Sequence, residues 1–213
     1  AQKAGVEIGN HSHTHPFFLN VSERGRDSFF KQEVQESQDL MKANLNITPK
    51  VFAYPYGEYD EEMNIALSEM GFKGAVAQNS GVITEYSNVY QFPRFPMSES
   101  YGDLEQFKDK MKMKGLAVNN EEAISTGYSG TVQKPKVLLE FKENGLFVES
   151  MQCFVQGSKC AKSVRITRDG NVALSIRPQT DLKARRTLFT ITIPDADGNW
   201  HWYSFLWVNP EVQ

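Results

Sequence analysis

Three of the chain's four histidines lie in one pentapeptide, His11-Ser12-His13-Thr14-His15, in the loop after a short predicted strand, Val6-Glu7-Ile8. Neutral imidazole is the commonest metal ligand among protein side chains. Imidazoles this close together would repel one another if they were protonated, so the pattern favours a neutral, metal-bound state. The alternative is a polar, solvated loop that binds no metal. The pentapeptide therefore predicts a metal site.

Two further segments carry residue types that suit a reactive site. Phe52-Ala53-Tyr54-Pro55-Tyr56-Gly57 ends a predicted strand, and its proline and glycine indicate a tight turn that lets backbone approach a ligand closely. In Phe92-Pro93-Arg94-Phe95-Pro96, a proline-flanked arginine could orient a carboxylate through two hydrogen bonds. Taken alone, the first segment is an ordinary strand-to-loop turn and the second carries a surface arginine.

The elements that must position these residues alternate between strand and helix over residues 1–115. We expect strands at 6–8, 51–54 and 75–77, and helices over 27–45, after Asp60 and after Asp103. Apolar residues at helical spacing predict the buried faces of the three helices: Phe30, Val34, Met41 and Leu45; Met63, Ala66, Leu67 and Met70; and Leu104, Phe107 and Met111. Alternating strands and helices imply a parallel sheet, open or closed into a barrel, with sites at the carboxyl ends of its strands.

The second half of the chain has a different pattern. Residues 116–135 are polar and weakly patterned, which is typical of a linker. Short strands are expected beyond it, at 137–141, 146–149, 163–167, 172–176, 187–193 and 200–208. Turn signals such as Glu143-Asn144-Gly145 separate them. This spacing predicts a small antiparallel β-sandwich over residues 136–213.

The chain has two cysteines, Cys153 and Cys160. If Gln156-Gly157 is a two-residue hairpin turn, the two cysteines lie opposite each other and could form a disulfide in an oxidising compartment. The alternative is a pair of small, half-buried thiols. A metal site at these cysteines is not expected, because no second pair of ligands lies nearby in the sequence.

Together, the three N-terminal segments resemble one family. Gly9-Asn10-His11-Ser12-His13-Thr14-His15-Pro16 is similar to the His-Ser/Thr-x-x-His motif of the polysaccharide deacetylases, carbohydrate esterase family 4, which share the NodB-homology domain. The turn Tyr54-Pro55-Tyr56-Gly57 and the segment Phe92–Pro96 resemble motifs of the branch that acts on poly-N-acetylglucosamine. The resemblance covers about residues 1–115 and implies an α/β fold, part of a distorted (β/α)-barrel. Residues 186–203 resemble small β domains appended to some bacterial members.

The resemblance implies a metal site of known type. His11 and His15 would bind a divalent metal, usually zinc. Ser12 would support the loop through a hydrogen bond, and His13, at a variable position of the motif, is the second choice of ligand.

The resemblance also implies a reaction, the hydrolysis of N-acetyl groups on an N-acetylated polysaccharide. The backbone N–H of Tyr56 would help hold the oxyanion, on a turn shaped by Tyr54 and Pro55, and Arg94 would steer the catalytic base. The metal polarises the acetyl carbonyl and activates a water, a carboxylate takes the proton of the water, and an acid protonates the leaving amine.

The chain departs from the family pattern in several places. The Asp-Asp motif of the family, which supplies the third metal ligand and the catalytic base, is expected upstream of Gly5. Either this segment of the same barrel is a partner outside this chain, or the chain is a truncated product. Only three or four of seven or eight barrel strands are expected. The family's Leu-x-x-His segment is not found, and His201 more plausibly packs within a Trp-His-Trp strand.

The remaining carboxylates offer no convincing base. Asp60 and Asp103 are expected to cap helices, while Glu58 and Glu99 are in loops without a motif around them. We therefore expect this chain alone to be inactive.

Two other functions remain open. One is a carbohydrate-binding fragment that uses the aromatic residues of one predicted strand, Trp200, Trp202, Tyr203, Phe205 and Trp207. Exposure of Trp200 or Trp202 would favour it, because sugars stack on flat aromatic faces. The other is an unrelated metal hydrolase in which His11, His13 and His15 all converge.

Composition narrows the possible partners and locations. The net charge of −3 gives no basic surface for nucleic acid. No stretch approaches the roughly 20 apolar residues that a membrane span requires. The family resemblance favours a periplasmic or extracellular bacterial protein.

Overall fold

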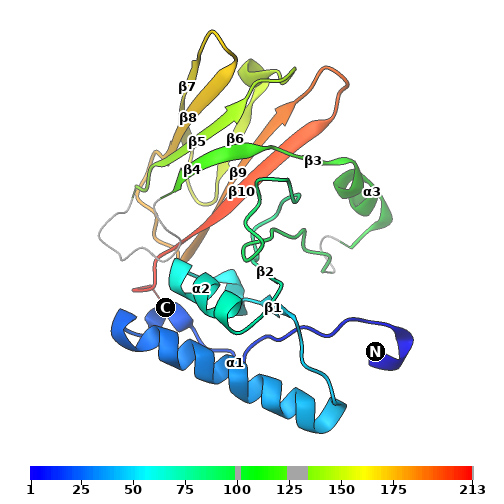
Figure 1. Ribbon diagram of the computed structural model, residues 1–213. Coiled ribbons are helices and arrows are strands. Elements are labelled where there is room, and N and C mark those ends of the chain that lie inside the picture. The colour runs from blue at the N-terminus through cyan, green and yellow to red at the C-terminus, as the bar shows by residue number, and fades with distance from the viewer. Residues whose placement is uncertain (99–101, 124–133, 213) are drawn as a thin grey trace. The chain divides into compact units, whose positions relative to one another are not determined.

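The computed structural model divides the chain into two compact units and describes residues 1–98, 102–123 and 134–212 (Figure 1). The first unit comprises residues 1–78 and 88–92, and the second comprises residues 79–87 and the chain from residue 93 onward. The predicted boundary at residue 115 differs from this division, because residues 79–87 and 93–115 group with the C-terminal strands. Glu99 and residues 124–133 of the predicted linker lie outside the described residues.

The first unit is built on a small parallel sheet. Strand β1 (Val51–Ala53) pairs with β2 (Gly74–Val76) in parallel. Parallel bridges from Asn10 to Phe52 and from Val76 to Phe92 add an extended segment on each side. The mixed α/β character is therefore confirmed. The predicted strand at 6–8 is wrong, because these residues form no ladder, and Val6 is exposed.

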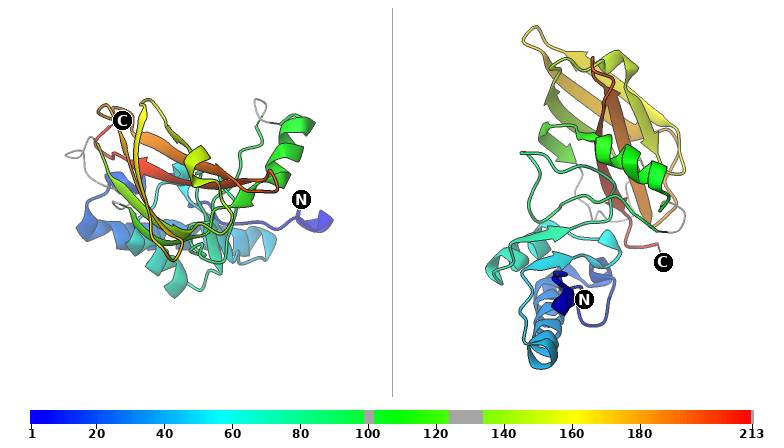
Figure 2. Two further views of the ribbon diagram at one scale, coloured as in Figure 1. Left: turned by 90° about the horizontal axis from the view of Figure 1, so that it is seen from above. Right: turned by 90° about the vertical axis from the view of Figure 1, so that its right-hand side faces the viewer.

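Two helices pack in this unit, α1 (Glu23–Leu45) and α2 (Glu61–Glu69), which Figure 2 shows from two further sides. Only the middle of α1 is buried: Phe30 and Val34 have no exposed surface, whereas Leu45 in its last turn is exposed. No helix among the described residues is both long and apolar enough to cross a bilayer.

Helix α2 begins where the sequence predicts. The Asp60 carboxylate accepts a hydrogen bond from the Met63 N–H at 2.9 Å, which satisfies one of the free donors of the first turn. Its second oxygen accepts from the Arg26 guanidinium at 2.6 Å. The predicted inner face is buried at Met63, Ala66 and Leu67.

Aromatic side chains fill the core of the first unit. Phe52 on β1 makes edge-on ring contacts with Phe30 of α1, with Tyr54 and with Phe72, at centroid distances of 5.5, 5.3 and 6.0 Å. Edge-to-face pairs of this kind stabilise a core beyond the apolar area that they bury. The strand that carries the Tyr54–Gly57 turn is thus fixed against α1.

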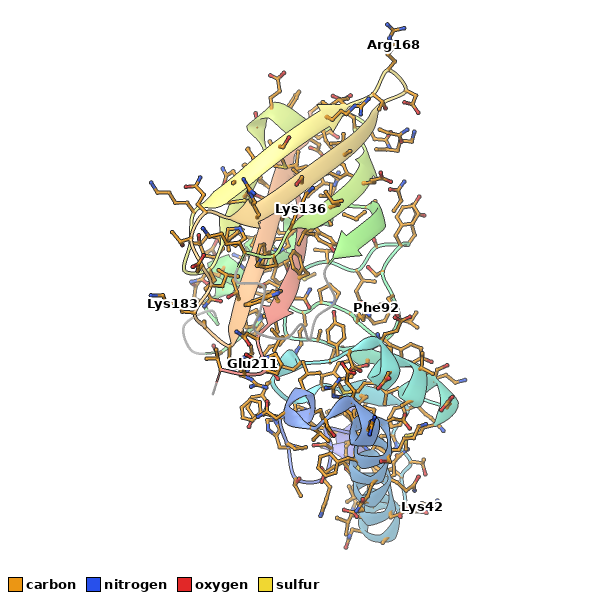
Figure 3. The ribbon with its side chains drawn as sticks, turned by 90° about the vertical axis from the view of Figure 1, so that its left-hand side faces the viewer. Lys42, Phe92, Lys136, Arg168, Lys183 and Glu211 are labelled. Carbon is orange, nitrogen blue, oxygen red and sulfur yellow. A yellow bond between two sulfur atoms is a disulfide. The ribbon has the colours of Figure 1, made fainter. Side chains whose placement is uncertain are left out.

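The second unit contains two four-stranded sheets. The first sheet has the order β3 (Lys114–Gly115), β10 (Trp200–Val208), β9 (Arg186–Pro194), β6 (Gln152–Val155). The second has the order β4 (Val118–Ala123), β5 (Val137–Lys142), β8 (Asn171–Pro178), β7 (Cys160–Ile166). Buried residues of both sheets, among them Leu139, Ile176, Ile191 and Trp207, form one hydrophobic cluster. Arg168 marks the turn between β7 and β8, and its side chain points away from the strands (Figure 3).

Three predictions in this region are wrong. Residues 118–123 of the predicted linker form strand β4, paired with β5. The pairing is not wholly antiparallel, because β3 runs parallel to β10. In place of the predicted strand at 146–149, the chain forms the 3₁₀ helix η4 (Val148–Ser150). Leu146 and Val148 reach the core from a turn in which Asn144 has φ of 39°.

Helix α3 (Leu104–Lys112) is present as expected, but the face that was predicted to be buried is exposed. Asp103 caps it, accepting from the N–H groups of Glu105 and Gln106. The predicted inner face is exposed, with Leu104, Phe107 and Met111 showing 65, 43 and 70% of their surface. Helical spacing identifies which face of a helix is apolar, but not whether another element covers that face. Helix α3 has no buried residue, so its apolar face is uncovered.

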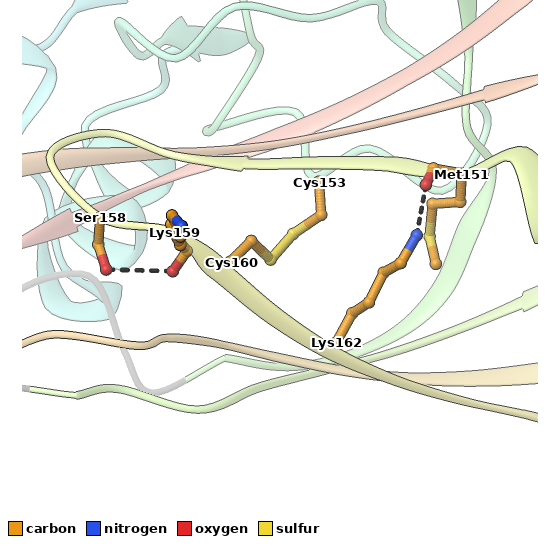
Figure 4. Close-up of a disulfide and its surroundings, with 6 residues drawn as sticks. All are labelled: Met151, Cys153, Ser158, Lys159, Cys160 and Lys162. Carbon is orange, nitrogen blue, oxygen red and sulfur yellow. Dashed lines mark hydrogen bonds between the residues drawn. A yellow bond between two sulfur atoms is a disulfide. The ribbon is translucent and has the colours of Figure 1, made fainter.

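Cys153 and Cys160 form a disulfide with a Cα–Cα distance of 5.9 Å (Figure 4). The turn between them is tight: the Ser158 N–H donates to the Val155 carbonyl, and Gly157 adopts φ of 77°. Beyond the turn, β6 and β7 diverge into different sheets rather than pairing as a hairpin. The disulfide therefore joins an edge strand of one described sheet to an edge strand of the other.

Removing this disulfide is expected to destabilise the second unit. A cross-link that closes a loop of this length lowers the entropy of the unfolded chain by an amount worth about 2.5 kcal/mol. Cys153→Ser/Cys160→Ser should lower the free energy of unfolding by that amount in chemical denaturation followed by tryptophan fluorescence. All three tryptophans lie in β10 of this unit, so they report on it directly. Equal stability of the wild type and the double variant would contradict the prediction.

Candidate metal centre

The histidine loop leaves the sheet through a fixed residue, Asn10. Its backbone joins β1, donating to the Val51 carbonyl and accepting from the Ala53 N–H, both at 2.9 Å. Its fully buried side chain donates to the Val34 carbonyl of α1 at 3.0 Å and accepts from the Ser12 N–H at 2.9 Å. Asn10 therefore ties the start of the loop to both the sheet and the helix.

A tight turn then brings two imidazoles together. Ser12 and His15 both adopt the left-handed backbone conformation, with φ of 65° and 57°, and the Ser12 hydroxyl accepts from the His15 N–H at 3.0 Å. As a result the rings of His11 and His15 contact each other edge-on, with their centroids 4.7 Å apart. The hydroxyl of Ser12 thus supports the loop in which the two rings meet.

The hydrogen bond of His11 decides which ring nitrogen can bind a ligand. Its Nδ1 lies 2.6 Å from the Ala53 carbonyl oxygen. A carbonyl oxygen can only accept, so Nδ1 carries the hydrogen and donates it. In the neutral ring, Nε2 then keeps its lone pair, which is the arrangement that second-shell carbonyls impose on metal-binding histidines.

Tyr56 forms one wall beside this pair. Its ring contacts His15 edge-on at 4.5 Å and stacks on Phe17 at 3.9 Å, with an interplanar angle of 8°. The turn that carries it is the 3₁₀ helix η3 (Pro55–Gly57), in which Tyr56 has φ of 58°. Tyr56 thus joins the histidine loop to the Tyr54–Gly57 turn.

Tyr54 and Pro55 lie beneath the surface of this turn, and both are buried. The Tyr54 hydroxyl donates to Asn64 Oδ1 of α2 at 2.8 Å, and burial raises the pKa of this phenol far above its usual value. The phenol therefore stays neutral and acts as a fixed support for the turn.

Gly57 is required by this turn, and Gly57→Ala is expected to disrupt it. The residue has φ of 71°, and an added Cβ would meet the Gln78 Cβ at 2.3 Å. The left-handed backbone and the clash together should cost at least about 2 kcal/mol of stability. Thermal unfolding measures the loss, and Gly5→Ala, which has φ of 79° but no atom within 4 Å of an added Cβ, isolates the contribution of the clash. Equal losses in the two variants would contradict the prediction.

The other predicted residues lie elsewhere. His13 Nε2 is 3.9 Å from Glu36 on α1, so this imidazole faces the helix. Arg94 belongs to the second unit, where its N–H donates to the Asn79 carbonyl. His201, also in the second unit, lies 3.1 Å from Asp195. Among the described residues, no group of three or more His, Cys, Asp or Glu side chains is arranged to hold a metal ion.

Strand β10 does not show the exposed aromatic surface that a sugar-stacking site needs. Phe205 and Trp207 are buried in the core, and Trp200 and Trp202 are only half-exposed. The Trp202 indole donates to the Ser80 carbonyl and contacts Phe95 edge-on. Trp200 and Trp202 therefore lack the open exposure that would favour a carbohydrate-binding strand.

Sequence reasoning missed three residues that shape the centre: Asn10, Phe17 and Glu33, whose carboxylate binds the loop from α1. Phe17 and Asn10 are next to the histidine cluster in sequence, so proximity was an available signal. No sequence signal marks Glu33, because it looks like any other charged position of an amphipathic helix.

The sequence model of the polysaccharide deacetylase family matches residues 1–75. The resemblance to polysaccharide deacetylases is confirmed. The match contains the histidine loop and the Tyr54–Gly57 turn and ends before Arg94, so it is shorter than the expected 1–115.

Several solved structures are similar to part of the chain. The Streptococcus pyogenes deacetylase PplD in complex with acetate is 21% identical, with 44% of this chain and 40% of that protein covered and a TM-score of 0.40. The BpsB deacetylase domain from Bordetella bronchiseptica is 17% identical, with 44% of each chain covered and a TM-score of 0.40. IcaB from Ammonifex degensii is 21% identical, with 46% of this chain and 45% of that protein covered and a TM-score of 0.41. The chain thus spans less than half the length of each.

Proposed function

We propose that the first unit carries the metal-binding half of the active site of a divalent-metal N-deacetylase. The observation that carries this proposal is the pairing of His11 and His15 at 4.7 Å, with the hydrogen of His11 held on Nδ1 by the Ala53 carbonyl. The match of residues 1–75 to the polysaccharide deacetylases supports it. The substrate is an N-acetylated polysaccharide of the N-acetylglucosamine type, and the products are acetate and a free amine on the polymer.

The donor set suits zinc or a similar divalent metal. The imidazoles of His11 and His15 offer nitrogen donors that zinc accepts readily, and catalytic zinc usually has three protein ligands and one open position. We propose that the third ligand and the catalytic base are the two aspartates of the family's first motif, on a partner segment outside this chain. When bound, the metal polarises the acetyl carbonyl and lowers the pKa of a water.

The residues of this chain prepare the site for hydrolysis of the amide. The backbone N–H of Tyr56 donates to the oxygen that becomes negatively charged when water adds to the acetyl carbon. Tyr54 and Pro55 hold that turn rigid, and Ser12 holds the loop. The new bond joins the water oxygen to the acetyl carbon, the C–N bond breaks, and the nitrogen takes a proton as the amine leaves.

A zinc titration followed by NMR of the histidine ring nitrogens tests the proposed centre. The chain has only four histidines, so each ring can be assigned. We expect zinc to shift Nε2 of His11 and the ring signals of His15, while Nδ1 of His11 stays protonated. His13 and His201 serve as internal controls and should not shift at stoichiometric zinc. Zinc-induced shifts at His13 equal to those at His11 would favour a three-histidine site instead, and no shift at any ring would refute the proposal.

The proposed compartment is the periplasm or the extracellular space. The Cys153–Cys160 disulfide supports this location, because disulfides persist in oxidising compartments and are rare in reducing ones.

A further inference from the structure

A buried carboxylate on helix α1 fastens the histidine loop. Glu33 has only 4% of its surface exposed. One of its oxygens accepts hydrogen bonds from two successive backbone N–H groups, those of His13 at 3.1 Å and Thr14 at 2.7 Å. Its other oxygen accepts from the Thr14 hydroxyl at 2.8 Å. All three bonds therefore join one point on the helix to the two residues in the middle of the loop.

The placement of these bonds matters more than their number. Residues 13 and 14 lie between His11 and His15, so fixing them fixes the separation of the two imidazoles from within the loop. The loop needs such support, because Ser12 and His15 both hold left-handed backbone conformations that cost free energy outside glycine. Hydrogen bonds to a charged acceptor are roughly twice as strong as those between neutral groups.

We propose that Glu33 is a positioning residue of the metal centre, which sets the geometry of His11 and His15 without touching the ion. This inference rests on the proposed function, since it assumes that the two histidines bind a metal. The competing explanation is that Glu33 only attaches the loop to the helix and contributes to global stability. The two explanations differ in what Glu33 does to metal affinity at temperatures where the protein is fully folded.

Four variants of the 213-residue chain separate these explanations. Glu33→Ala removes all three acceptor contacts. Glu33→Gln keeps one carbonyl oxygen for the two N–H groups and places an amide where the Thr14 hydroxyl can accept. Val34→Ala, at a fully buried neighbour, destabilises the same helix turn but leaves the loop contacts of Glu33 in place. Glu36→Ala removes a carboxylate one turn along, 3.9 Å from His13.

Zinc affinity is measured by competition with a chromophoric chelator, well below the unfolding midpoint of every variant, and the visible spectrum of the Co²⁺ form reports ligand geometry. We expect Glu33→Ala to lose roughly tenfold or more in affinity, as outer-shell substitutions at metal sites do, and to change the Co²⁺ spectrum. Glu33→Gln should recover most of the affinity. Val34→Ala should lose thermal stability but keep its zinc affinity and Co²⁺ spectrum. Glu36→Ala should keep its thermal stability, zinc affinity and Co²⁺ spectrum.

Each outcome decides between the explanations. Unchanged affinity in Glu33→Ala, or an equal loss in Val34→Ala, would overturn the positioning role. Absence of zinc binding by the wild type would refute the proposed function instead, so the two failures are distinguishable. If Glu33→Ala does not fold, Glu33→Asp takes its place with the same expectation, because it keeps the charge but shortens the side chain by one methylene.

Discussion

His11→Ala and His15→Ala are each expected to weaken zinc binding by more than roughly 100-fold, because losing a ligand should cost more than the 10–100-fold typical of outer-shell substitutions. Either variant leaves a single imidazole of the pair, which cannot chelate. Isothermal titration with zinc measures the loss. His13→Ala and His201→Ala are matched controls, since one imidazole faces Glu36 and the other lies beside Asp195 in the second unit. Both controls should bind zinc like the wild type.

The same two substitutions should abolish acetate release in a longer form of the protein that carries the proposed aspartate pair. A chelator should have the same effect, and added zinc should reverse it in the wild type only. N-acetylglucosamine oligomers are the substrate for this assay, with acetate measured enzymatically. Full activity of either variant would show that the substituted imidazole does not bind the catalytic metal.

The 213-residue chain by itself is expected to release acetate roughly 10²–10⁴ times more slowly than that longer form, which is the usual contribution of a positioned general base. Several of the described carboxylates already have other roles. Asp60 caps α2 and pairs with Arg26, and Glu33 binds the loop backbone. Asp103 caps α3 in the second unit. Glu99 lies outside the described residues.

Parallel assays of the two forms, both with saturating zinc, measure this difference. Adding a separate polypeptide that carries the proposed aspartate pair should raise the rate if it can dock on the first unit. Acetate release by the 213-residue chain at a rate close to that of the longer form would show that the assignment of the base to an upstream aspartate is wrong.

The sequence was most informative where function restricts residue type. Three clustered histidines after an extended segment and a Tyr-Pro-Tyr-Gly turn after a strand predicted two loops that the structure brings together through the contact of His15 with Tyr56. Asp60 and Asp103 were predicted as helix caps and are caps, because a short acceptor side chain before a helix has few other roles.

Residues that act through three-dimensional contacts could not be predicted in this way. The contact between Glu33 and Thr14, which are 19 residues apart in sequence, depends on the path of α1 and not on any local pattern. The exposure of the Leu104 face of α3 depends on which other elements cover it, and helical periodicity contains no such information. The facing cysteines were anticipated, whereas the divergence of their strands into two sheets depends on how β6 and β7 pair with β9 and β8.

The divergence of β6 and β7 has a consequence for the behaviour of the protein under reducing conditions. Each is the last strand of its described sheet, so each presents unpaired backbone groups along one side. Apolar side chains lie exposed on these strands, with Phe154 on β6 and Val164 and Ile166 on β7. Exposed apolar strand edges are templates for pairing with other chains. Because the Cys153–Cys160 disulfide joins these two edge strands, we expect its reduction to free them for such pairing and to promote self-association as well as unfolding.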